Sequence, residues 1–60
     1  MKIYRLLGSG GLYVLSYKVG RLTGRQLQYA LYDPLAKQQC GFWTNVPVNM
    51  IKKFEAVYEQ

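Results

Sequence analysis

Residues 12–32, LYVLSYKVGRLTGRQLQYALY, decide the fold, because they contain two alternating runs on either side of a short bend. From Leu12 to Val19 one face collects aromatic and aliphatic residues at every second position, and Arg25 to Tyr32 repeats the pattern. A period of two is typical of β-strands. The five residues between the runs include two glycines, which predicts a β-hairpin.

The register of this hairpin follows from the pairing of its side chains. If Val19 faces Arg25, every further pair on that face joins an aromatic residue to an aliphatic one. These pairs are Tyr17 with Leu27, Leu15 with Tyr29, and Tyr13 with Leu31. Each such pair stabilises a sheet by about 0.2–1 kcal/mol. A slip by one residue would turn every side chain to the other face, so we predict a single register.

Two further strands are predicted beside the hairpin. Residues 2–7 can return to the first strand of the hairpin across a glycine-rich turn. Asp33-Pro34 interrupts the second strand and starts another turn. Residues 38–44 can then pair with that strand, with Cys40 opposite Leu31 and Phe42 opposite Tyr29.

The C-terminal segment has the spacing of a helix. Its apolar residues lie on a single helical stripe, and they are Met50, Ile51, Phe54, Val57 and Tyr58. Pro47 suits the first turn of such a helix, and Asn45 suits the N-cap. A helix of this length is marginal alone, so we expect its stripe to pack on the sheet.

We therefore predict one α+β domain over residues 1–60, a two-layer arrangement of an antiparallel meander of about four strands with one C-terminal helix packed on one face. The alternative is an SH3-like small barrel, in which the strands curl and the helix only plugs one end. In the first architecture the helix covers the face of Leu15 and Tyr29. The opposite face of the sheet would then be open to a partner.

The net charge of the chain is +5, and all of it comes from the first half. Residues 1–32 contain five cations and no acid, whereas three lysines balance three acids in residues 33–60. Such an asymmetry favours a polyanionic partner or serves solubility.

The residue inventory argues against catalysis. The chain has no histidine and a single cysteine, Cys40, so the usual nucleophile–base pairs cannot be built. One thiol and three scattered acids give no recognisable metal site. We expect no enzymatic activity, no metal and no cofactor, and we interpret Cys40 as a small buried residue.

No apolar run in the chain is long enough for a signal peptide or a membrane span. The sequence therefore predicts a cytoplasmic protein that makes no contact with a membrane.

The open face of the predicted sheet mixes cations with aromatic rings, which is typical of surfaces that bind DNA or RNA. In this interpretation the rings stack on bases and the cations contact phosphates. The candidate nucleic-acid-binding residues are Arg5, Lys18, Arg21, Arg25, Tyr32 and Trp43.

The same face also suits a protein interface, because its apolar residues form a centre with cations around it. The candidate interface residues are Ile3, Leu12, Val14 and Trp43. The function would then be that of a small regulator or inhibitor whose partner has an acidic surface. Since exposed apolar patches often mark contacts between copies, we also expect a homo-oligomer.

Overall fold

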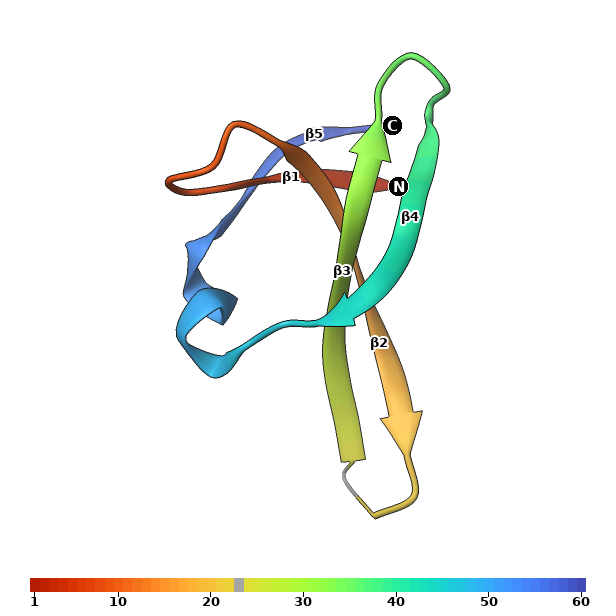
Figure 1. Ribbon diagram of the computed structural model, residues 1–60, viewed down its shortest axis with the longest axis vertical. Coiled ribbons are helices and arrows are strands. Elements are labelled where there is room, and N and C mark those ends of the chain that lie inside the picture. The colour runs from red at the N-terminus through yellow and green to blue at the C-terminus, as the bar shows by residue number, and fades with distance from the viewer. Residues whose placement is uncertain (23) are drawn as a thin grey trace.

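The computed structural model describes residues 1–22 and 24–60, and within them the chain forms five antiparallel strands and one short 3-10 helix. The strands are β1 (Lys2–Leu6), β2 (Leu12–Gly20), β3 (Gly24–Asp33), β4 (Gln38–Asn45) and β5 (Phe54–Glu59). The helix η1 covers Val48–Lys53. All strands belong to one sheet with the order β4-β3-β2-β1-β5, which curls strongly (Figure 1).

The central hairpin confirms the predicted register pair by pair. Val19 faces Arg25, Leu15 faces Tyr29 and Tyr13 faces Leu31. The ladder continues to Gly20 and Gly24 beside the bend, and Gly24 has a positive φ of 72°, a conformation that glycine adopts without steric cost. Thr23, at the bend itself, lies outside the described residues.

The predicted C-terminal helix is wrong. η1 ends at Lys53, and residues 54–59 form β5, which pairs with β1 from Leu6–Phe54 to Lys2–Glu59. The segment FEAVYE is rich in residues that favour strands. A short apolar run of this kind fits a helix or a strand equally well, and the otherwise unpaired edge of β1 supplies backbone hydrogen bonds that select the strand.

Strand β4 follows the prediction at one end only. Leu31 faces Cys40 as expected, but Tyr29 faces Thr44 in place of Phe42, because the register shifts between these two pairs. The extra residues on β4 form a bulge with Gly41 at a positive φ of 81°. The bulge turns Phe42 into solvent, where its side chain is 93% exposed.

The main cluster of buried residues lies on the face of the sheet that the sequence prediction left open. Ile3, Val14, Ala30 and Tyr32 form this cluster, and Leu12 packs against it. Figure 1 shows why: the ends of β1 and β5 curl over to the end of β3. The sequence prediction placed these residues on the exposed face of the sheet, and for them that prediction is wrong.

The opposite face, expected to be the core, carries a partly buried aromatic cluster. Tyr13, Tyr29 and Phe54 pack against one another with ring centroids 5.7–6.0 Å apart, two of the three pairs edge to face. Such aromatic pairs add about 0.5–1.5 kcal/mol each beyond the area they bury. Phe54 thus meets Tyr29 as predicted, but it does so from a strand.

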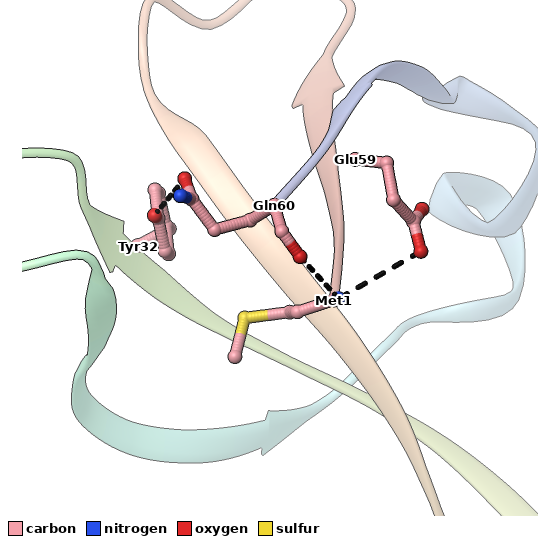
Figure 2. Close-up of polar contacts among 4 residues, drawn as sticks. All are labelled: Met1, Tyr32, Glu59 and Gln60. Carbon is pink, nitrogen blue, oxygen red and sulfur yellow. Dashed lines mark hydrogen bonds and ion pairs between the residues drawn. The ribbon is translucent and has the colours of Figure 1, made fainter.

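The two ends of the chain are tied together beside Tyr32 (Figure 2). The Met1 amino group donates to the Gln60 carbonyl oxygen at 2.9 Å and lies 3.7 Å from the Glu59 carboxylate. The Tyr32 hydroxyl donates to the Gln60 side-chain oxygen at 2.7 Å. These contacts hold the end of β5 against β3 and close the curled sheet over Ile3.

Replacing Ile3 with Ala tests where the core lies. Ile3 is completely buried, so the truncation should lower the free energy of unfolding by about 2–5 kcal/mol. Leu35→Ala is the matched control, because Leu35 is 95% exposed and its truncation should change stability by less than about 0.5 kcal/mol. Equal denaturant midpoints for the two variants would contradict this assignment of the core.

Tyr32 makes stability depend on alkaline pH. Burial raises the pKa of its hydroxyl above the ordinary value of 10.0, and nearby Tyr58 and Asp33 raise it further. Neutral Tyr32 therefore stabilises the fold below the unfolded pKa, and this contribution is lost as the pH rises through the higher folded pKa.

The Tyr32→Phe variant should accordingly lose less stability than the wild-type protein between about pH 8 and about pH 11. Denaturant unfolding of both proteins at the two pH values gives the comparison. Parallel losses would show that Tyr32 does not titrate as its burial requires.

Candidate functional site

Most residues of the predicted apolar interface are not exposed on the surface of the structure. Ile3 and Val14 are buried, and Leu12 is half-buried against them. Their placement on an open face is wrong, because the strands curl around this side of the sheet. Trp43 alone of the four remains substantially accessible, with 40% of its surface exposed on β4.

Two of the six predicted nucleic-acid-binding residues are engaged within the fold. Tyr32 is 4% exposed and its hydroxyl is bonded to Gln60, so the expectation of an exposed ring is wrong. Arg5 donates to the Glu55 carboxylate at 3.1 Å. Its charge is therefore matched by an acid that β5 places beside it.

The other three cations among the six predicted residues lie where β2 and β3 extend beyond their neighbours. We call residues 16–22 and 24–26 the basic arm. Lys18, Arg21 and Arg25 are all exposed on it, and Figure 1 shows this hairpin projecting from the rest of the sheet. The arm lies along the longest dimension of the molecule, whose extents are 37 × 22 × 18 Å.

No acid in the described part of the chain neutralises the basic arm. Glu55 pairs with Arg5, and Glu59 lies beside the Met1 amino group. Asp33 accepts hydrogen bonds from the backbone N–H groups of the turn that follows it, at Leu35 and Ala36. The three acids are thus all used at other positions.

Arg25 is held in place by an aromatic ring. Its guanidinium carbon lies 4.2 Å from the centroid of Tyr17, within the range of a cation–π contact. Tyr17 itself is 56% exposed. The planar cation of Arg25 therefore lies over an accessible ring on the basic arm.

Two clefts border Tyr17 on the face of the aromatic cluster. The larger, of about 500 Å³, is lined by Tyr17, Arg25, Gln26, Leu27, Asn45, Val46, Pro47, Val48 and Ile51. The smaller, of about 320 Å³, is lined by Tyr4, Leu15, Ser16, Tyr17, Leu27, Ile51 and Phe54. Neither lining includes an acidic residue.

Sequence reasoning missed these clefts because it covered their residues with a helix. Tyr17, Leu27 and Ile51 border both clefts, and all were assigned to a closed core. The signal that could have revealed them is the strand alternation in FEAVYE. If that segment is a strand, the only helical segment left to cover the face of the aromatic cluster in the described part of the chain is η1.

Metal-binding clusters are absent from the described part of the chain. Within residues 1–22 and 24–60, no three His, Cys, Asp or Glu side chains lie together so that they could hold a metal ion. Cys40 is exposed, so its interpretation as a buried residue is wrong. None of the helices described is long and apolar enough to cross a membrane.

Comparison of the chain with protein-family models, with curated proteins and with solved structures finds no match.

Proposed function

We propose that this protein binds nucleic acid, with the basic arm contacting phosphates. The observation that carries the proposal is the separation of charge: Lys18, Arg21 and Arg25 are exposed on one projecting hairpin, while the described acids are paired or bonded elsewhere. Contacts between cations and phosphates supply most of the sequence-independent affinity of such proteins.

The form of the arm supports the same function. A two-stranded β-ribbon is one of the elements that fit the major groove of a duplex, and its cations can equally follow a single strand. Arginine is suited to either partner because its planar guanidinium binds phosphate oxygens in pairs and stays charged at any working pH. DNA and RNA are both compatible with this chemistry.

We infer that the architecture is an SH3-like small barrel. Its support is the curl of the five-stranded sheet, the single helical turn η1 before the last strand, and the tie between the chain ends. In such a barrel the basic arm is the extended end of the β2–β3 hairpin. It is not part of a two-layer arrangement of sheet and helix.

A second candidate function is binding to another protein through strand β4. Phe42 is 93% exposed there beside Trp43, on an edge of the sheet. The strand sequence QQCGFWTN has no charged residue, so two copies of this cationic chain can meet at β4 without placing like charges opposite each other. The first partner to test is therefore a second copy, and an acidic protein surface is the next.

Removing the arginines of the arm tests the first function. The double variant Arg21→Ala, Arg25→Ala should keep the fold, because neither residue is buried or ion-paired in the described structure. Its binding to unrelated duplexes should weaken to a similar degree. The slope of log affinity against log salt should fall by about 0.9 for each phosphate contact that is lost.

The matched control is Lys2→Gln, Lys37→Gln, which removes the same charge at the end of the molecule opposite the arm (Figure 1). This control should bind more tightly than the arm variant and keep most of the wild-type salt slope. Equal losses in both double variants would contradict a specific role of the arm. A wild-type protein that binds no oligonucleotide at about 50 mM salt would refute the function itself.

Self-association tests the second function. Sedimentation of the wild-type protein at about 100 µM should show a dimer or larger species if the contact is of micromolar strength, about 8 kcal/mol. Phe42→Lys should give a monomer, whereas Leu35→Lys adds the same charge at an equally exposed site outside β4 and should leave the dimer intact. A monomeric wild-type protein at this concentration would exclude the β4 contact.

A further inference from the structure

We infer that the two clefts beside Tyr17 form a single groove that holds unpaired bases of a single-stranded nucleic acid. We call their combined lining the Tyr17 groove. The inference rests on the proposed nucleic-acid function and adds to it the class of nucleic acid and the place where its bases lie. The basic arm binds phosphates, and the groove distinguishes an open strand from a duplex.

The two clefts adjoin each other, since three residues line both. Tyr17, Leu27 and Ile51 line both of them. Their volumes, about 500 and about 320 Å³, fall within the range of roughly 300–1,000 Å³ that small-molecule sites occupy. The groove is therefore large enough for flat heterocycles.

The walls of the groove suit stacking. Tyr4, Tyr17 and Phe54 contribute rings, and Leu27 and Ile51 contribute aliphatic surface between them. Every base has two π-faces, so aromatic walls bind bases with little dependence on sequence. A duplex cannot use these walls, because its bases are already stacked on one another.

Two amides give the larger cleft both a donor and an acceptor. The Asn45 side-chain oxygen accepts a hydrogen bond from Gln28 at 2.9 Å, which directs the amide N–H groups of Asn45 toward other acceptors. The Gln26 amide donates to the Leu27 carbonyl oxygen at 3.0 Å, and its own oxygen remains an acceptor. The edge of an unpaired base presents the complementary groups.

The charge around the groove selects an anionic partner. Arg25 lies in the wall of the larger cleft and is stacked on Tyr17. Lys52 and Lys53 directly follow Ile51 in η1 and are exposed. Because the lining has no carboxylate, a strand whose bases enter the groove would have cations nearby for its phosphates.

The decisive experiment uses the wild-type protein and three ligands at one salt concentration. These are a single strand of about ten thymidines, an abasic strand of the same length with the same phosphates, and a duplex of the same length. Removing the bases should weaken binding roughly 5- to 150-fold for each base that stacks in the groove. The single strand should also bind more tightly than the duplex.

Variants of Tyr17 identify the groove as the place of stacking. Tyr17→Ala should weaken binding of the thymidine strand roughly 5- to 150-fold, but it should leave binding of the abasic strand and the salt slope nearly unchanged. Tyr17→Phe keeps the ring and should bind as the wild-type protein does. This pair separates stacking from loss of charge, because no cation is removed.

The outcomes distinguish the two proposals. Equal affinity for the thymidine and abasic strands, or a duplex that binds as tightly as the single strand, overturns the groove inference and leaves the proposed function standing. Binding of neither strand nor the duplex overturns both proposals. An equal loss for Tyr17→Ala and Tyr17→Phe would overturn stacking on this ring.

Discussion

Every other strand of this protein depends on the antiparallel ladder between β2 and β3. β4 is bonded to β3, β1 to β2, and β5 to β1, so the position of each follows from the register of that hairpin. Because side chains alternate, the same register sends Val14 and Ala30 to the buried cluster and Tyr13 and Tyr29 to the opposite face. The core and the Tyr17 groove are thus two results of one alignment.

The hairpin could be predicted from sequence because its pairing is local and repetitive. Which of its two faces is buried could not be predicted. Alternation divides residues between two faces but does not say which face becomes closed, and both faces here carry apolar residues. Large rings such as Tyr17 and Tyr29 suggested the core. The small side chains of Val14 and Ala30 instead allow close approach across the curled sheet, and a chain of this length cannot fully cover both faces.

Features that depend on contacts between residues far apart in the chain also could not be predicted from the sequence. The spacing of the last apolar residues is local information and favours a helix. Strand β1, however, pairs with residues 54–59 along its whole length, with one register shift between Ile3 and Tyr4. Arg5 shows the same limit, since its partner Glu55 is 50 residues away in the chain. The exposure of Arg21 and Arg25 was predictable because residues next to a hairpin bend lie outside any core.

The separation of charge gives the molecule a permanent electric dipole along its long axis. The basic arm lies at one end, whereas at the other Lys2 is the register partner of Glu59 and Lys37 follows Asp33 across a turn. Such a dipole aligns a protein in the field of a polyanion before any contact forms, and it raises the rate of productive encounters. The basic arm would then contact the polyanion first. The protein would be oriented before contact, at distances up to about the Debye length.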